Sequence, residues 1–210
     1  MEHAVVDQGA ERRHWLRLAA SLAVGALAIG LVEQRAGAAG DGAGTGKTPG
    51  AAGADAANLR SIAVLDFELI DDHENPLTKD AQQIRLRNST VQLRRELAEQ
   101  RLYRVVDAAP YAGVQRDLQA QHEYLYRCDD CADQIGRQAG ADLVMGAWVQ
   151  KVSELILNLN VEIYDVGAKK VIFMKSVDLR GNDDRSWQRA LHYLVRDMAE
   201  KRAADPGYAR

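Results

Sequence analysis

The two cysteines, Cys128 and Cys131, are the residues best suited to chemistry. No other cysteine is present, and the spacing Cys-x-x-Cys places their α-carbons about 5–6 Å apart on one turn of helix, within reach of a disulfide. The closed loop is very short, so the bond would add only about 1–3 kcal/mol of stability. One interpretation is therefore a small structural disulfide that ties a loop to the start of a helix.

Thiol–disulfide exchange is the other interpretation of this pair. A reactive cysteine needs a pKa lowered by a helix N-terminus or by nearby cations. The expected helix start and Arg127 favour the thiolate, whereas Asp129 and Asp130 oppose it. The Trp that usually precedes such a pair and the Gly-Pro inside it are missing, and Ala132 stands where haem attachment needs a histidine. The structural and the redox-active interpretations both stay open.

A metal site is not expected from the histidines. Zinc takes about four protein ligands in a structural site, and the cysteine pair supplies two. His122 lies six residues before Cys128, and His73 and His192 are far along the chain. We therefore expect surface or capping histidines and no metal.

Acidic and hydroxyl side chains give no further catalytic pattern. A cluster of carboxylates follows the first apolar segment and comprises Asp66, Asp71, Asp72 and Glu74. Its spacing fits no calcium loop, so we expect a solvated acidic loop. No serine lies in a Gly-x-Ser-x-Gly elbow. The sequence therefore predicts no catalytic residues and no cofactor.

Gly46-Lys47-Thr48 resembles the end of a phosphate-binding P-loop. The full pattern needs a glycine at position 41, which is Asp41. A P-loop also leaves a buried strand and enters a helix, whereas Pro49 follows Thr48 here and the surrounding stretch is rich in Ala and Gly. We expect a flexible linker here and no nucleotide.

Polar and apolar side chains alternate near residue 160. One set comprises Leu157, Leu159, Val161 and Ile163, and the other comprises Asn158, Asn160, Glu162 and Tyr164. A period of two places the second set on one face of a strand, and Trp148 on the preceding strand is expected to point the same way. This face is a candidate recognition surface. The alternative is that the domain's own helices cover it.

The positions of these residues depend on the elements that carry them. The chain has 210 residues, of which 47% are hydrophobic and 27% charged, and this composition fits one globular domain with a tail. Its net charge is −3 with no basic face, so a nucleic-acid partner is not expected.

The first residues have the pattern of an export signal. A basic segment, 12–17, precedes an uncharged run over 18–32 and a small-residue site at 36–38. The run is short for a membrane-spanning helix, which needs about 20 apolar residues. We expect residues 1–38 to be a signal cleaved before Ala39, with an uncleaved membrane anchor as the alternative. Arg12 and Arg13 also resemble a twin-arginine signal.

After the signal we expect a linker over 39–58, then a folded domain over 59–202 and a frayed tail over 203–210. Within the domain we expect a strand over 61–67, a helix capped by Thr78 that ends near 100, and a strand over 102–106. Residues 111–125 are ambiguous and helical in part. A helix opens at Cys128 and ends at Gly140, residues 143–179 form an antiparallel meander, and a helix capped by Asn182 ends the domain.

Two helices show apolar faces. Ile84, Val91 and Ala98, with Leu86, Leu93 and Leu97 beside them, mark the first, and Trp187, Leu191, Leu194, Val195 and Met198 mark the last. The order strand–helix–strand–helix–three strands–helix predicts an α/β domain, a mixed sheet with helices packed on it.

The segments SIAVLDFEL, RLYRVVD and IGRQAGADLVMGAWVQKVS are similar to TolB amino-terminal-like domains and to the α/β domain of curli-secretion lipoproteins. CDDCADQIGRQAGAD and WVQKVSELILNLNVEIYDV resemble a family of uncharacterised exported bacterial proteins. The resemblance covers about residues 60–200. It implies a periplasmic, non-catalytic α/β domain that takes part in an envelope assembly.

The sequence thus favours an exported binding or assembly module with an envelope or periplasmic protein partner, attached to the membrane only if its N-terminal segment is uncleaved. A periplasmic thiol–disulfide oxidoreductase using Cys128 and Cys131 is one alternative. A carrier with a small-ligand pocket beside the sheet is another.

Overall fold

The structure is a computed structural model that describes residues 58–71 and 74–210. Residues 1–57, which hold the expected export segment and nearly all of the expected linker, lie outside the described residues. Among those described, the strands are β1 Ser61–Val64, β2 Glu68–Asp71, β3 Arg104–Val105, β4 Leu143–Lys151, β5 Leu157–Asp165 and β6 Lys170–Leu179. The helices are α2 Pro76–Glu99, α3 Ala112–Gln121, the short 3-10 turn η1 Leu125–Arg127, α4 Cys131–Ala139 and α5 Asp184–Ala204.

The strands form one mixed sheet in the order β3-β1-β4-β5-β6, and β2 also pairs with β4. The pairs β1–β3, β1–β4 and β2–β4 are parallel, whereas β4–β5 and β5–β6 are antiparallel. The predicted α/β class, the mixed sheet and the C-terminal meander are therefore confirmed.

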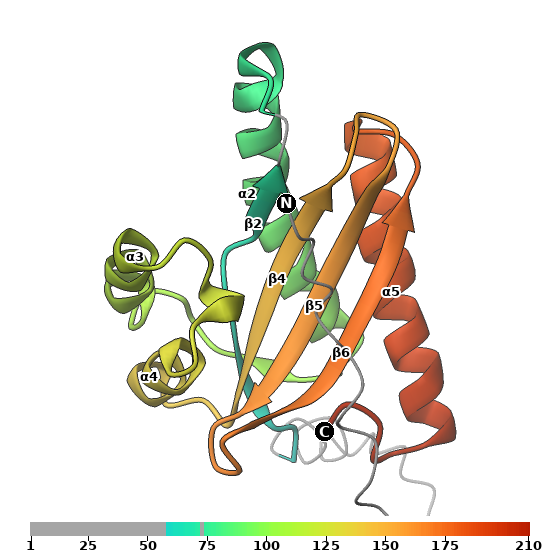
Figure 1. Ribbon diagram of the computed structural model, residues 1–210. Helices are drawn as coiled ribbons and strands as arrows, with labels where there is room; N and C mark the ends of the chain where they lie inside the picture. Colours follow the sequence, from blue (N-terminus) through green and yellow to red (C-terminus); the bar gives the residue numbers. More distant parts are fainter. Residues whose placement is uncertain (1–57, 72–73) are drawn as a thin grey trace, which may run out of the picture. The chain divides into compact units, whose positions relative to one another are not determined.

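Helices cover the sheet on both sides (Figure 1). The side chains of Leu157, Leu159, Val161 and Ile163 point from β5 into the larger core, which includes the apolar faces of α2 and α5. The smaller core lies on the other side, where Ala63, Leu65 and Val144 contact residues of α3 and α4. The alternation along β5 thus separates one fully covered face from one that the smaller helices cover only in part.

The start of the domain is tied to β4 by one carboxylate. Asp142, immediately before β4, accepts hydrogen bonds from the Ser61 backbone N–H at 2.8 Å and the Ser61 hydroxyl at 2.6 Å. These bonds hold the pKa of Asp142 below its usual range. The Gly-Ala-Asp segment that opens β4 therefore also fixes where β1 begins.

The strand expected over 61–67 is interrupted, and the acidic loop expected after it contains β2. The Leu65 N–H still donates to the Met145 carbonyl of β4 at 3.0 Å. The chain then leaves the sheet, and the Phe67 N–H donates to Thr90 Oγ1 on α2 at 3.0 Å. The chain then rejoins β4 as β2, with Glu68 opposite Trp148. Strand β2 was not predicted, because two of its four residues are acidic and their partners are distant in sequence.

Asp71 at the end of β2 belongs to a buried ionic cluster. The Lys151 ammonium lies 2.9 Å from Asp71 and 2.7 Å from Glu154, and the Lys151 and Asp71 side chains are only 3% and 5% exposed. Another lysine that interrupts an apolar pattern, Lys175 on β6, pairs with Asp197 on α5. Each lysine is tolerated because a carboxylate is placed beside it.

The helix starts differ from the predicted ones. Asn75, not Thr78, caps α2, since its side chain accepts the Leu77 N–H at 3.0 Å. Asp183, not Asn182, caps α5, and Asn182 accepts the Trp187 indole N–H at 3.1 Å instead.

The helix expected to open at Cys128 begins three residues later, at Cys131, and Asp130 precedes its first turn. It ends at Gly140, as predicted, with a φ of 60°. The ambiguous segment 111–125 contains α3 and the first residue of η1.

The apolar face of α5 is confirmed, since all five predicted residues are buried. On α2, the buried residues include Leu86, Leu93 and Leu97, whereas Ile84 and Val91 are 50% and 63% exposed. The seven-residue spacing of Ile84 and Val91 was therefore misleading, because the row of leucines faces the core.

The C-terminal residues are not frayed as the sequence suggested. α5 continues to Ala204, and the Ala209 carbonyl accepts hydrogen bonds from the Tyr103 hydroxyl and from Arg202, the latter at 2.5 Å. Tyr208 lies edge-on to Phe173, with ring centroids 5.4 Å apart. A buried tyrosine hydroxyl needs a partner, and the tail supplies it.

None of the helices that the structure describes has the length and apolarity to cross a bilayer.

Replacing Lys151 by methionine should reduce the free energy of unfolding by about 3–5 kcal/mol, because the buried Asp71 carboxylate would lose its ammonium partner. Urea unfolding at neutral pH measures the loss. The matched control is Lys170→Met on the exposed end of β6, which should change stability by less than about 0.5 kcal/mol. Equal stability of the two variants would contradict the role given to the cluster.

Candidate functional site

The candidate site lies on the partly covered face of the sheet. Five residues form it, and we call them the acidic–aromatic face: Glu68 of β2, Tyr126 of η1, Trp148 of β4, and Asn160 and Glu162 of β5. In the sheet register Glu68 lies opposite Trp148, Trp148 opposite Asn160, and Glu162 opposite Gly146. Alternate residues of a strand point to the same face, so these strand side chains are neighbours.

An aromatic stack is the centre of this face. The Trp148 indole is stacked on the Tyr126 ring, with centroids 4.3 Å apart and planes at 9°. The Arg127 guanidinium lies 5.3 Å from the Tyr126 centroid and 5.4 Å from that of Tyr124. Trp148 is only 7% exposed, so Tyr126 is the more accessible ring. Stacked and cation–π contacts of this kind give a rigid, amphipathic surface.

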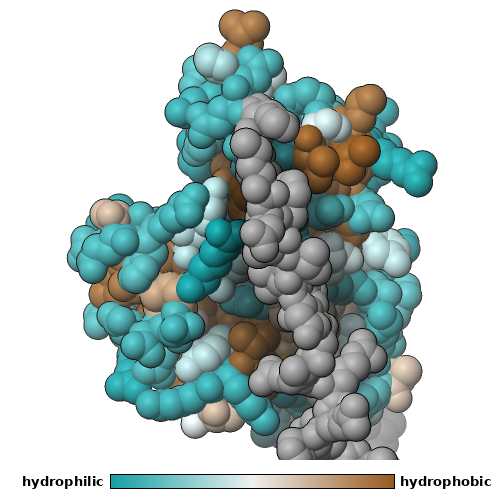
Figure 2. All heavy atoms as spheres, in the orientation of Figure 1, coloured by the Kyte–Doolittle hydropathy of each residue, from teal (hydrophilic) through white to brown (hydrophobic). Residues whose placement is uncertain are grey.

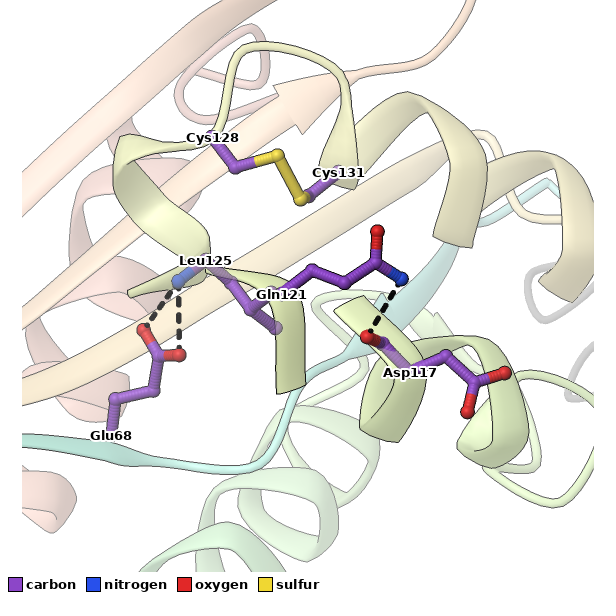
Figure 3. The surroundings of a disulfide bond; sticks show 6 residues. All are labelled: Glu68, Asp117, Gln121, Leu125, Cys128 and Cys131. Carbon is purple, nitrogen blue, oxygen red and sulfur yellow. Dashed lines mark hydrogen bonds between the residues drawn. A yellow bond between two sulfur atoms is a disulfide. The ribbon is translucent and has the colours of Figure 1, made fainter. Parts of the chain in front are cut away.

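Glu68 fastens the aromatic segment to the sheet. Its two carboxylate oxygens accept the Leu125 backbone N–H at 3.0 and 3.1 Å (Figure 3). Burial raises the pKa of Glu68, and hydrogen bonds from the backbone N–H groups of Leu125 and Tyr126 partly oppose the rise. Glu68 is therefore a structural acceptor that places Tyr126 over Trp148.

Glu162 is the carboxylate of this face that lacks such support. Burial, and secondarily the negative charge of Glu68, raise the pKa of Glu162. Within residues 58–71 and 74–210, no group forms a hydrogen bond or ion pair with its carboxylate. Gly146 provides the space, since a Cβ there would lie 3.3 Å from Glu162 Cγ. Glu162 is thus a half-buried anion available to a cation or donor from outside.

Not all of the predicted recognition residues are exposed to solvent. Trp148, Asn158, Asn160 and Glu162 share this face, and the Asn160 amide donates to the Asn158 carbonyl at 3.1 Å. Tyr164 is on the same face but packs against the smaller core beside α4. Beyond Glu162, Met174 of β6 is 65% exposed, so the face continues to the sheet edge.

Glu68, Tyr126 and Met174 were not predicted from the sequence as part of this face. Glu68 stood in an apparent loop, and Tyr126 in the ambiguous segment. The Tyr124-x-Tyr126-Arg127 cluster was the available signal, but nothing in the sequence indicated that it would lie over Trp148.

Cys128 and Cys131 are joined as a disulfide at the start of α4, with α-carbons 5.5 Å apart (Figure 3). Cys131 is fully buried and Cys128 half-buried. His122, expected to be a surface or capping histidine, has a ring nitrogen within 4.8 Å of both sulfurs. Arg127, expected to favour a thiolate, is engaged with the two tyrosine rings instead.

Two open surface grooves lie elsewhere on the described part of the chain. One groove between α2 and α5 is lined by Gln92, Glu96, Arg189 and His192, and another is lined by β6 and α5. Neither is lined by a residue of the acidic–aromatic face.

Exposed apolar side chains gather at the β4–β5 hairpin (Figure 2). Val152, Leu155 and Ile156 are 52%, 74% and 57% exposed. They lie at the far end of β4 from the smaller core.

One protein-family model matches this chain. The model of DUF3280, described as a protein of unknown function (DUF2380), matches residues 60–198. This match confirms the resemblance to a family without an assigned function. None of the curated proteins matches the chain.

Solved structures give weak likenesses. LpoB of E. coli is 12% identical with a TM-score of 0.40, over 87% of this chain and 96% of that one. The hypothetical protein CT253 of Chlamydia trachomatis is 14% identical with a TM-score of 0.42, over 70% and 99%. Lipoprotein GNA1162 of Neisseria meningitidis is 17% identical with a TM-score of 0.39, over 70% and 98%. Likenesses of this strength say nothing about activity or partner.

Glu162→Gln should raise the midpoint of thermal unfolding at pH 7 by a few degrees. The pKa of Glu162 is higher in the folded state than its usual 4.5, so its carboxylate costs stability once the pH rises through the folded-state pKa. Below pH 4.5 the carboxyl group is protonated in both states, so the gain should disappear.

Thermal unfolding at pH 7 and pH 4 measures this difference. Glu200→Gln is the control, because Glu200 on α5 is 69% exposed and pairs with the exposed Arg196. A gain from Glu162→Gln that is the same at both pH values would show that the carboxylate charge is not its cause.

Proposed function

The chain belongs to the DUF3280 family of proteins of unknown function, and from this premise we propose that it is an exported, non-catalytic module of the cell envelope that binds a protein partner. The acidic–aromatic face is the proposed binding surface. The observation that carries the proposal is the half-buried Glu162 carboxylate beside the Trp148–Tyr126 stack.

The chemistry of this face indicates what the partner presents. An arginine or lysine from the partner would pair with Glu162 and lower its raised pKa, so binding would relieve a cost that the free protein carries. Tyr126 and Met174 offer flat, adaptable apolar area on either side of that carboxylate. The proposed partner is therefore a protein surface with a basic side chain surrounded by apolar ones.

Export and envelope location rest on the sequence. The basic, apolar and small-residue segments within 1–38 support export, and the disulfide between Cys128 and Cys131 is suited to an oxidising compartment. The oxidoreductase alternative receives no support from the described residues, because Cys131 is buried and Arg127 is engaged elsewhere.

A photo-reactive amino acid at position 174 should crosslink to one discrete protein in the envelope of the native host. Met174 is the most exposed side chain beside Glu162, whereas Arg196 on α5, across the sheet, is the control position and should give no such product. Charge reversal by Glu162→Lys should reduce the product from position 174 by at least about tenfold, since a paired, partly buried charge is worth about 2 kcal/mol or more.

Glu200→Lys is the matched charge reversal and should leave the yield unchanged. If the yield from position 174 is the same in both charge reversals, or if position 196 gives the same product, the face is not the binding surface.

Mass spectrometry of the chain recovered from its host tests export. A mass that begins at Ala39 is expected for a cleaved signal, and full-length mass in the membrane fraction for an anchor. Both forms should gain two alkylated cysteines only after reduction. Recovery of full-length chain from the cytoplasmic fraction, with both thiols open to alkylation, would rule out the proposed export.

A further inference from the structure

His122, Cys128 and Cys131 come together where three helical segments end or begin. The candidate ligand atoms, a His122 ring nitrogen and the two Sγ atoms, all lie within 4.8 Å of one another. From these residues we propose a redox-dependent metal site: when the disulfide is reduced, the two thiolates and the His122 imidazole bind one Zn²⁺ ion.

The backbone holds all three residues in place. His122 follows α3, and its N–H donates to the Leu118 carbonyl at 2.9 Å. Cys128 follows η1, and its N–H donates to the Leu125 carbonyl at 3.0 Å. Cys131 is the first residue of α4. Because each position is fixed by a helix end, opening the disulfide leaves the three side chains as near neighbours.

The distances suit a tetrahedral ion. Zinc binds sulfur at about 2.3 Å and imidazole nitrogen at about 2.0–2.1 Å, so ligand atoms in a tetrahedral site lie about 3.5–3.8 Å apart. Side-chain rotation is enough to bring the two sulfurs to this separation. The His122 ring nitrogen, which lies within 4.8 Å of each sulfur, has to move closer by about 1 Å. The α-carbons of the two cysteines, 5.5 Å apart, need not move far to place two thiolates around one ion.

The charges around the pair favour a cation over free thiolates. Asp129 and Asp130 are exposed and adjacent to the cysteines, and they oppose an unpaired thiolate. One Zn²⁺ ion with two thiolates and a neutral imidazole has no net charge, which removes that repulsion. Among the described residues no side chain caps α4, so backbone N–H groups of its first turn are also open to a thiolate.

The burial of the three residues indicates where the Zn²⁺ ion enters and where its fourth ligand binds. Cys131 is buried, Cys128 half-buried and His122 exposed, so the ion would enter from the His122 side. No fourth His, Cys, Asp or Glu among the described residues joins the group. The fourth ligand is therefore water, as in three-ligand zinc sites that keep an open position.

The two states of the site differ by a balanced exchange. An external dithiol gives two electrons and two protons to the Cys128–Cys131 bond and becomes a disulfide, which leaves two protein thiols. Zn²⁺ then binds and two protons leave those thiols. The disulfide and the zinc site are therefore alternative states of the same residues. The inference is independent of the proposed binding function.

The test uses the full chain, reduced with excess dithiothreitol without oxygen and then freed of reductant. Zn²⁺ alone, titrated against a chelating dye, should bind at one equivalent, and Co²⁺ in its place should give a thiolate-to-cobalt absorption band. His122→Ala should weaken Zn²⁺ binding by more than about tenfold. His122 is exposed, so this variant should keep the wild-type circular dichroism.

His192→Ala, on the exposed surface of α5, is the matched control and should bind Zn²⁺ as the wild type does. The oxidised protein should bind no Zn²⁺ at this site. The proposal is overturned if oxidised and reduced chains bind equally, if His122→Ala binds as tightly as wild type, or if the cobalt complex lacks the thiolate band.

Discussion

Strand β4 is hydrogen-bonded to β1 and β2 along one edge and to β5 along the other. Its side chains alternate between the two cores, with Met145, Ala147 and Val149 in the larger and Val144 in the smaller. Each neighbouring strand is placed by its register against β4. The acidic–aromatic face exists because β4 presents Gly146 and Trp148, rather than further apolar side chains, beyond the reach of α4.

The two carboxylates of that face have different physical roles. Glu68 is half-buried but accepts backbone hydrogen bonds, so its charge is partly compensated and it holds η1 in place. Glu162 is half-buried without such bonds, and the Glu68 charge adds to its cost. An uncompensated anion beside a rigid aromatic pair costs the folded protein stability. Locally unfavourable arrangements of this kind concentrate at functional sites.

The short segment between α3 and α4 connects the two candidate sites. Over ten residues it passes from His122 through Tyr126 to Cys131, and Glu68 anchors its centre. The ring that covers Trp148 and the cysteine pair are therefore parts of one tethered loop. The disulfide restrains the end of this segment, and the hydrogen bonds from Leu125 to Glu68 restrain its centre.

Local sequence determined most of the elements, because periodicity is a property of neighbouring residues. The alternation over 157–163 indicated the meander, the apolar row of α5 indicated its buried face, and Gly140 indicated a helix end. Local sequence patterns did not indicate the interruption after Val64, strand β2 or the ordered tail. Each depends on a distant partner: Thr90 for Phe67, Lys151 for Asp71, and Tyr103 for Ala209.

The residues of the candidate sites were likewise predictable from the sequence only in part. The sequence alone placed Trp148, Asn160 and Glu162 on one face, whereas only tertiary packing brought Glu68 and Tyr126 onto it and His122 beside the cysteines, since their positions are set by contacts that no local pattern encodes.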